Sequence, residues 1–218
     1  MIKENINSKE LIYWMQMYIN LKSEYSIGYS NFYKILKSFS FNIEFALDSI
    51  KNSQEFENLS LVPEYLVYEE IEKCNKLNIS IICYDDELYP SMLKNISNPP
   101  LILFAKGNLN LLKKDKIAIV GSRIASLGVL KTTSVFAKEI AESGICVVSG
   151  FAKGIDTQAC IAAMKYGTIQ VVATGLDIIY PEENKKLFYD VLENGGLFLS
   201  EYKVGENCSK WMNIKKNG

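Results

Sequence analysis

Residues 116–156 read KIAIVGSRIASLGVLKTTSVFAKEIAESGICVVSGFAKGID, and this stretch decides the fold. It holds two apolar runs of strand length, Lys116 to Val120 and Ile145 to Ser149, separated by a helical pattern from about Leu127 to Ser143. Gly144 follows the helical pattern directly, in the position that a helix C-cap favours. A strand, a crossover helix and a second apolar strand predict a parallel βαβ unit.

The same alternation continues toward the carboxyl end of the chain. Two further strand candidates are Ile169 to Thr174 and Leu197 to Ser200, and two further helical stretches are Thr157 to Tyr166 and Glu183 to Asn194. Each helical stretch ends at a glycine, as the first one does. Continuously apolar strands joined by helices predict a right-handed parallel sheet that is covered on both faces. We therefore expect the α/β class and a Rossmann-like domain.

The amino-terminal part of the chain has a different pattern. From Lys9 to about Leu61 the apolar residues recur at helical spacing, which predicts a small domain of three short helices. A break at residues 26–30 ends the first helix, Ser30 is the expected N-cap of the second, and the third begins near Asn42. Three short helices in this length resemble a helix-hairpin-helix or SAM-like module.

Pro63 marks the expected boundary between two domains. Residues 1–63 would form the helical domain and residues 64–218 the Rossmann-like domain. After the boundary, Glu64 to Leu77 is amphipathic, and Ile79 to Tyr84 is a short apolar run of strand length. The second domain is therefore expected to begin with a helix and a strand before the regular alternation starts.

The composition excludes several kinds of catalytic site. The 218 residues contain no histidine, which rules out Ser-His-Asp and Cys-His triads, HExxH metalloprotease helices and Cys/His zinc fingers. The 24 basic and 25 acidic side chains give a net charge of -1 at pH 7. Because this balance creates no overall attraction to a polyanion, a nucleic-acid site has to be a local patch.

The cysteine pattern predicts reduced thiols in a cytoplasm. The five cysteines form no CxxC pair and are odd in number, which argues against a disulfide framework or a structural metal site. The amino terminus lacks a basic-then-apolar signal pattern, and no run of about 18 uncharged apolar residues occurs. We therefore expect neither secretion nor a membrane span. The cysteines are Cys74, Cys83, Cys146, Cys160 and Cys208.

Polar, glycine-containing segments follow the first two strands of the alternation. The carboxyl ends of neighbouring parallel strands meet at one edge of a sheet, where ligands bind. Glycines that admit close backbone approach, hydroxyls, free helix amides and one cation in each segment predict an anion site there. The candidate phosphate-binding residues are Gly121, Ser122, Arg123, Ser149, Gly150, Lys153, Gly154 and Asp156.

The residues of this site have different expected roles. Arg123 would hold a phosphate bidentately, and Lys153 would act as a mobile point charge, which suits a sugar-phosphate backbone or a nucleotide. We expect Asp156 to be a helix cap or dipole partner rather than a catalytic acid. Neither segment matches G-x-G-x-x-G or G-x-x-x-x-G-K-[ST], so no cofactor is expected. The competing interpretation is that Gly121 and Gly150 only form tight turns.

Four sequence blocks in the correct order resemble the DprA/Smf DNA-processing family. They are IAIVGSR, VVSGFAKGID with its following helix, TGLDIIYPEEN and LFLSEY, and the segment from Tyr84 through Asn108 resembles the family's lead-in to the same domain. The similarity covers roughly residues 80 to 202. It implies a cytoplasmic protein, without an established enzymatic activity, that binds and protects single-stranded DNA during natural transformation and helps to load the recombinase RecA. The implied DNA pocket consists of the two glycine-containing segments described above.

Two features depart from the family pattern. Where the family has Ala-His after its GID block, this chain has Ala159-Cys160, and we expect a small buried cysteine to fill the position. Beyond Ser200-Glu201 the family continues with an Arg-Asn-Arg segment and with the surfaces for dimerisation and RecA, whereas this chain stops at Gly218. We expect a truncated sheet in which the strand near Leu197, or its neighbour, exposes an apolar edge, giving marginal stability or self-association.

Other functions are also compatible with parts of the sequence. A phosphoribohydrolase-like enzyme would require the block PGGxGTxxE, which is absent, and Glu201 would be its strand-end carboxylate. An inert fragment and a nucleotide-binding regulatory module are the remaining alternatives. Phe151 could stack on a base, but we expect it to anchor its loop in the core.

Overall fold

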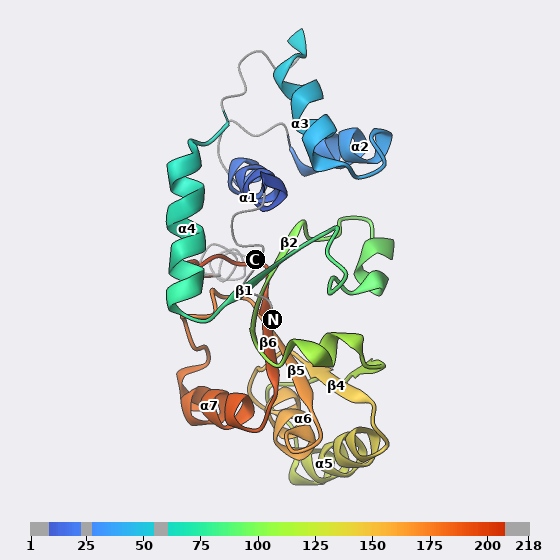
Figure 1. The fold of residues 1–218 in the computed structure, drawn as a ribbon. Helices are drawn as coiled ribbons and strands as arrows, with labels where there is room; N and C mark the ends of the chain where they lie inside the picture. The colour runs from blue at the N-terminus through green and yellow to red at the C-terminus, as the bar shows by residue number, and fades with distance from the viewer. Residues whose placement is uncertain (1–8, 23–27, 55–60, 208–218) are drawn as a thin grey trace, which may run out of the picture. The chain divides into compact units, whose positions relative to one another are not determined.

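The computed structural model describes residues 9–22, 28–54 and 61–207, which form two compact units (Figure 1). The first unit contains the chain up to Asn75 together with Ile82–Ile102, and the second contains Lys76–Ile81 and the chain from Leu103 onward. The first unit therefore extends past Pro63. No helix in the described ranges is long and apolar enough to cross a membrane.

The first unit contains the helices that the sequence predicts. They are α1 (Lys9–Leu21), α2 (Tyr29–Ser38), α3 (Ile43–Lys51) and α4 (Glu64–Lys76), followed by the short helix η2 (Ser91–Asn95). The predicted start of α3 is confirmed, because the Asn42 side chain accepts a hydrogen bond from the Phe45 N–H at 3.0 Å. The predicted N-cap of α2 is wrong. Gly28, with a φ of 77°, is the N-cap and Ser30 lies inside the helix, because glycine adopts this left-handed turn without steric cost. Residues 26 and 27 of the predicted break lie outside the described ranges.

The second unit contains most of one six-stranded sheet. Its strand order is β1-β2-β6-β5-β4-β3. The four strands of the regular alternation are parallel, as predicted, and β2 runs antiparallel to β6. The strands are β1 (Ser80–Cys83), β2 (Ile102–Gly107), β3 (Lys116–Ala118), β4 (Cys146–Ser149), β5 (Thr168–Val172) and β6 (Leu197–Ser200). The α/β class and the Rossmann-like arrangement are therefore confirmed.

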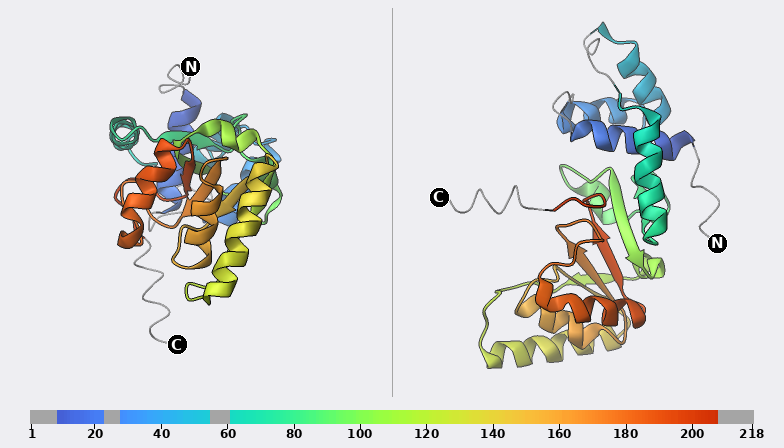
Figure 2. Two further views of the ribbon diagram at one scale, coloured as in Figure 1. Left: turned by 90° about the horizontal axis from the view of Figure 1, so that it is seen from below. Right: turned by 90° about the vertical axis from the view of Figure 1, so that its left-hand side faces the viewer.

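The crossover helices α5 (Leu127–Glu142), α6 (Ile155–Ala163) and α7 (Lys185–Glu193) lie side by side on one face of the sheet (Figure 2). They are accompanied by the short helices η3 (Leu109–Lys113) and η4 (Glu182–Asn184). The expected coverage of both faces by crossover helices is wrong, because the strands from β3 to β6 follow one another in a single direction. Successive right-handed crossovers in one direction all fall on the same side.

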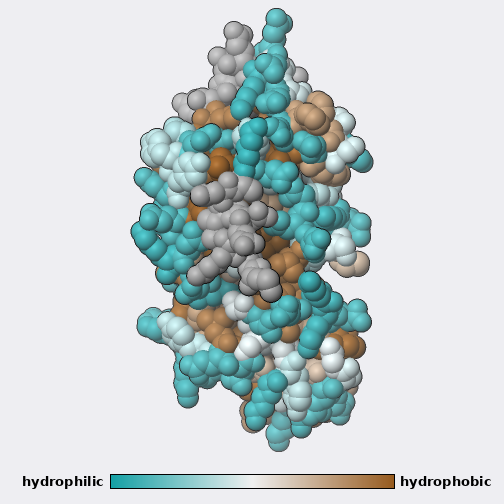
Figure 3. Space-filling view, viewed as in Figure 1, coloured by the Kyte–Doolittle hydropathy of each residue, from teal (hydrophilic) through white to brown (hydrophobic). Residues whose placement is uncertain are grey.

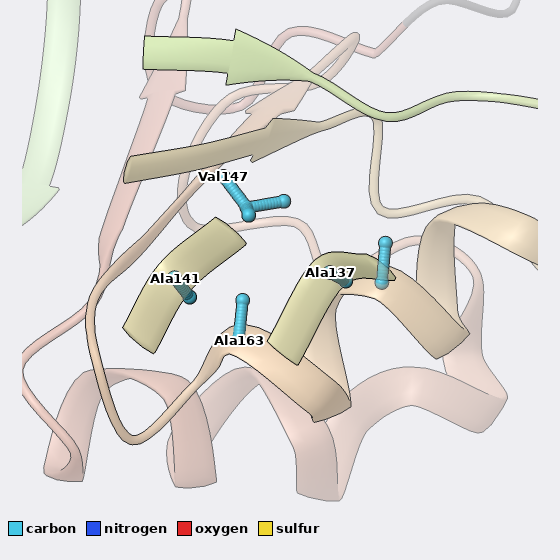
Figure 4. Close-up of a cluster of buried hydrophobic side chains, with 5 residues drawn as sticks. Ala137, Ala141, Val147 and Ala163 are labelled. Carbon is cyan, nitrogen blue, oxygen red and sulfur yellow. The ribbon is translucent and has the colours of Figure 1, made fainter. Parts of the chain in front are cut away.

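Small side chains let these helices approach the sheet closely. Ala137 and Ala141 of α5 pack with Ala159 and Ala163 of α6 against Val147 of β4, and all five side chains are buried (Figure 4). Because alanine projects only a methyl group, the two helices can pack against each other and the strand at short range. Cys160 beside this cluster is fully buried, as expected, and burial raises the pKa of its thiol to about 12. The four described cysteines are buried and free of disulfides.

The exposed edge of the sheet is β3 rather than β6. Every residue of β6 is buried, because β5 and β2 flank it on both sides. The expectation of an unpaired edge at the strand near Leu197 or at its neighbour is therefore wrong, because β2 returns antiparallel along β6, and β5 and β2 are themselves paired on both sides. By contrast, all three residues of β3 are exposed, and Ile117 retains 45% of its accessible surface. Apolar surface also shows as brown patches between teal side chains over the lower part of Figure 3.

This edge predicts concentration-dependent self-association. An exposed strand edge offers unpaired backbone groups to a second chain. In addition, the α5 residues Val129 and Phe136, about two helical turns apart, are 49% and 58% exposed. We expect sedimentation velocity to show association that Phe136→Ser weakens. Val135→Ser, on a different side of the same helix, is the control and should leave the association unchanged. A chain that stays monomeric at all concentrations would contradict the prediction.

Candidate nucleic-acid interface

Two loops occupy the carboxyl ends of the neighbouring strands β3 and β4. We call residues Gly121–Arg123 the GSR loop and residues Gly150–Gly154 the FAKG loop. Because Ala118 pairs with Val148 in parallel register, the carboxyl ends of the two strands lie next to each other. The structure thus brings together the two segments that the sequence singles out.

The two loops touch through their backbones. The N–H of Ile155, the first residue of α6 directly after the FAKG loop, donates to the Ser122 carbonyl oxygen at 3.2 Å. Gly154 has a φ of 80°, and a Cβ atom there would lie 2.3 Å from the Ser122 oxygen and 2.7 Å from the Arg123 oxygen. Only glycine provides both this backbone conformation and this close approach. The distance between the two loops therefore depends on Gly154.

Asp156 lies beneath both loops. Its side chain is buried, and its Oδ1 accepts a hydrogen bond from the Gly121 N–H at 3.1 Å. A Cβ atom at Gly150 would lie 2.7 Å from its Oδ2, so the carboxylate occupies the space that this glycine leaves open. The carboxylate sits in the first turn of α6, where a negative charge is favourable, but the amide that it binds belongs to the GSR loop. Asp156 is thus a positioning residue, a role that its place in the sequence alone does not reveal.

The two serines of the site differ in exposure. Ser149 is buried and its Oγ donates to the Ile119 carbonyl at 2.7 Å, so it links β4 to the end of β3. Ser122 is exposed, and its Oγ donates to the Ile124 carbonyl at 2.5 Å and accepts from the Ile124 N–H at 3.1 Å. This local turn shapes the GSR loop next to Arg123. Of the predicted residues, those exposed at the surface are Gly121, Ser122, Arg123, Gly150 and Lys153.

Phe151 anchors the FAKG loop in the core, as expected. It is only 1% exposed, and its ring lies edge-on to Phe198 with 5.0 Å between the ring centroids. Its φ of 60° is left-handed, a conformation that costs energy for a residue with a side chain. Burial of the ring, together with a hydrogen bond from Asn184 Nδ2 to the Phe151 carbonyl at 3.0 Å, holds this conformation.

The two cations of the site are in different environments. Arg123 is exposed, and no described residue accepts a hydrogen bond from its guanidinium. Lys153 forms an ion pair with Glu183 of η4. The hydrogen bond from Lys153 lowers the pKa of the Glu183 carboxyl below its usual value. Glu183 and Asn184 were not predicted as site residues, although both lie in the block TGLDIIYPEEN that follows the third strand of the alternation.

The loop after β5 is held by hydrogen bonds to the segment that follows β6. The Gly205 N–H donates to Asp177 Oδ1 at 2.9 Å, and the Gly175 N–H donates to the Glu206 carbonyl at 2.6 Å. These amides are therefore already used between the loop after β5 and the segment after β6. Across the described ranges, no three His, Cys, Asp or Glu side chains lie close enough together to hold a metal ion.

The fold and these loops define a Rossmann-like protein in which glycine-rich loops with two cations follow the carboxyl ends of neighbouring strands. The chain belongs to the DNA recombination-mediator protein A family, whose sequence model matches residues 80–218. This membership confirms the resemblance to DprA/Smf proteins.

Individual relatives support the assignment. DprA from Streptococcus pneumoniae is 46% identical over 128 residues, which cover 58% of this chain and 45% of the relative. Protein Smf from Borreliella burgdorferi is 31% identical over 191 residues, which cover 84% of this chain and 61% of the relative. The chain thus spans about half the length of the curated relatives that it matches.

Two solved structures are similar to this one. The X-ray structure of Streptococcus pneumoniae DprA matches with a TM-score of 0.60 and 26% identity, covering 100% of this chain and 74% of the other. Helicobacter pylori DprA, described for its single-stranded DNA binding mode, matches with a TM-score of 0.54 and 30% identity. That match covers 64% of this chain and 62% of the Helicobacter pylori chain.

Proposed function

We propose that the GSR and FAKG loops bind the phosphate backbone of single-stranded DNA. The observation that carries this proposal is the backbone contact between the loops. This contact keeps Arg123 and Lys153 together at the carboxyl ends of β3 and β4. The guanidinium is suited to a bidentate grip on one phosphate and the ammonium to a point contact with another. The Helicobacter pylori relative, which has a described single-stranded DNA binding mode, supports the same ligand.

Binding by these groups would be independent of base sequence. Backbone amides and cations contact phosphates, whereas sequence is read at base edges. The buried ring of Phe151 cannot serve as a stacking platform in this conformation. The affinity should therefore be similar for different base compositions and should fall with salt, with a slope of about -0.7 per phosphate contact on a log-log plot.

The proposed role is that of a binding protein rather than an enzyme. The buried carboxylate beneath the loops, Asp156, accepts a hydrogen bond from the Gly121 amide, which suits support of the loops rather than proton transfer. By analogy with the family, we propose that the protein acts in the cytoplasm on DNA that enters during transformation. Contact with RecA and formation of a homodimer are further proposals that rest on the family resemblance.

Loss of both cations should abolish most of the affinity for single-stranded DNA. We expect Arg123→Ala combined with Lys153→Ala to weaken binding of a labelled oligo-dT by at least about tenfold, because two charge-assisted contacts are lost. Fluorescence anisotropy at two salt concentrations measures this, and a melting curve shows that each sample is folded. The wild-type chain should also have the steeper salt dependence.

The control for this experiment removes two cations elsewhere. Lys131→Ala combined with Lys138→Ala changes the net charge equally on the exposed side of α5 and should leave the affinity nearly unchanged. Equal losses in the two double variants would show non-specific attraction. A folded wild-type chain that does not bind oligo-dT would overturn the proposed function.

A further inference from the structure

Lys153 already has an anionic partner in the free protein. Its ammonium pairs with the Glu183 carboxylate of η4, 30 positions further along the chain. Both side chains are more than half exposed, at 55% and 65%. The pair therefore lies at the surface, where a DNA phosphate would have to reach the lysine.

Hydrogen bonds made by the side chain next to Glu183 fix the position of the pair. Asn184, the neighbour of Glu183, is buried and its Nδ2 donates to the Phe151 carbonyl at 3.0 Å and to Thr157 Oγ1 at 2.9 Å. These two acceptors lie on either side of Lys153 in the sequence. The Thr157 hydroxyl in turn donates to the Ala152 carbonyl at 2.7 Å. Asn184 thus ties η4 to the FAKG loop and presents Glu183 to Lys153.

The two cations of the site consequently differ in availability. Arg123 is open to a ligand, whereas the charge of Lys153 is balanced by a carboxylate. A phosphate that contacts Lys153 must displace this carboxylate or share the lysine with it, and two anions that approach one ammonium repel each other.

We propose that Glu183 is an internal competitor that the DNA phosphate must displace from Lys153. The inference rests on the proposed function of the two loops. It makes Arg123 the first contact of the strand and Lys153 the second. A phosphate tethered next to one held by Arg123 reaches Lys153 at high effective concentration and can replace the carboxylate, whereas a free phosphate ion cannot benefit from such tethering. Glu183 thereby favours a continuous strand over small anions.

Removing the competitor should strengthen binding. We expect Glu183→Gln to tighten oligo-dT binding about two- to fivefold, the range that an exposed ion pair of this kind contributes. Glu182→Gln removes the same charge from the adjacent position of η4 and is the matched control, for which we expect a smaller change. Glu183→Ala, which also removes the hydrogen-bond acceptor, should tighten binding at least as much as Glu183→Gln.

A double-mutant cycle tests whether Glu183 acts through Lys153. In the Lys153→Ala background, Glu183→Gln should leave the oligo-dT affinity unchanged, because there is no cation left to compete for. If Glu183→Gln tightens binding equally in both backgrounds, the carboxylate acts only by general repulsion and the inference is overturned. The wild-type affinity itself, and its loss in the Arg123 and Lys153 double variant, tests the proposed function separately.

A spectroscopic measurement reports the displacement directly. The carbon chemical shift of the Glu183 carboxyl group, followed by NMR against pH, gives its pKa in the free protein, which Lys153 lowers. Oligo-dT should raise this pKa, because the carboxylate loses its cation and gains a phosphate neighbour. Lys153→Ala should raise it without DNA. A Glu183 titration that is identical with and without bound oligo-dT would overturn the inference even if the DNA binds.

Discussion

Replacing Gly154 by alanine is expected to weaken oligo-dT binding by more than about tenfold and to lower the free energy of unfolding by about 2–3 kcal/mol. The added Cβ would lie 2.3 Å from the Ser122 carbonyl oxygen and 2.7 Å from that of Arg123, and both atoms are backbone atoms of the GSR loop. Neither can rotate away as a side chain could. The loop that carries Arg123 must therefore move.

Gly144→Ala is the matched control for this substitution. Gly144 also has a positive φ, 92°, but a Cβ there would meet nothing within 4 Å. This variant isolates the cost of a left-handed backbone for alanine, about 1–2 kcal/mol, without a clash. It should lose stability in a denaturant melt and retain its affinity in the anisotropy assay. If the two variants bind oligo-dT equally well, close contact between the loops is not needed for binding.

Much of the fold could be predicted from local patterns in the sequence. The apolar runs that form β3 to β6 are separated by helical patterns, and a glycine follows each of these patterns. This alternation predicts parallel strands joined by crossover helices. The antiparallel direction of β2 could not be predicted, because an apolar run such as Ile102–Gly107 has no direction of its own. Its pairing with β6 decides which strand is exposed, so the edge at β3 also escaped prediction.

The candidate site shows the same division between local and distant information. Gly121, Arg123 and Lys153 were identified because they follow strands whose carboxyl ends must meet. The hydrogen bond between Asp156 and the Gly121 amide joins residues 35 positions apart. The ion pair of Lys153 with Glu183 spans 30 positions. Such contacts depend on the packing of whole elements, and no short motif specifies them. The signal that could have indicated Glu183 is its place in the segment after β5, which is the strand next to β4.

Substitutions of Asp156 should separate its charge from its hydrogen bond. Asp156→Ala removes the acceptor and leaves the Gly121 N–H without its partner, so we expect a loss of about 2 kcal/mol in the free energy of unfolding. Because the GSR loop is then less ordered before binding, oligo-dT affinity should fall about tenfold. Denaturant melts and fluorescence anisotropy measure the two effects.

Asp156→Asn keeps an oxygen that can accept from the Gly121 N–H but removes a negative charge beneath the proposed phosphate site. It should cost less stability than Asp156→Ala, and its affinity for oligo-dT should be equal to that of the wild type or higher, because less repulsion opposes the phosphate.

Opposite changes in affinity for the two variants would establish that the aspartate acts by holding the GSR loop. If both variants bound more tightly, its charge would be the dominant effect and the loop would not depend on it. If Asp156→Asn lost as much affinity as Asp156→Ala, an amide oxygen would not be able to replace the carboxylate at the Gly121 amide, and charge-assisted bonding would be required to order the loop.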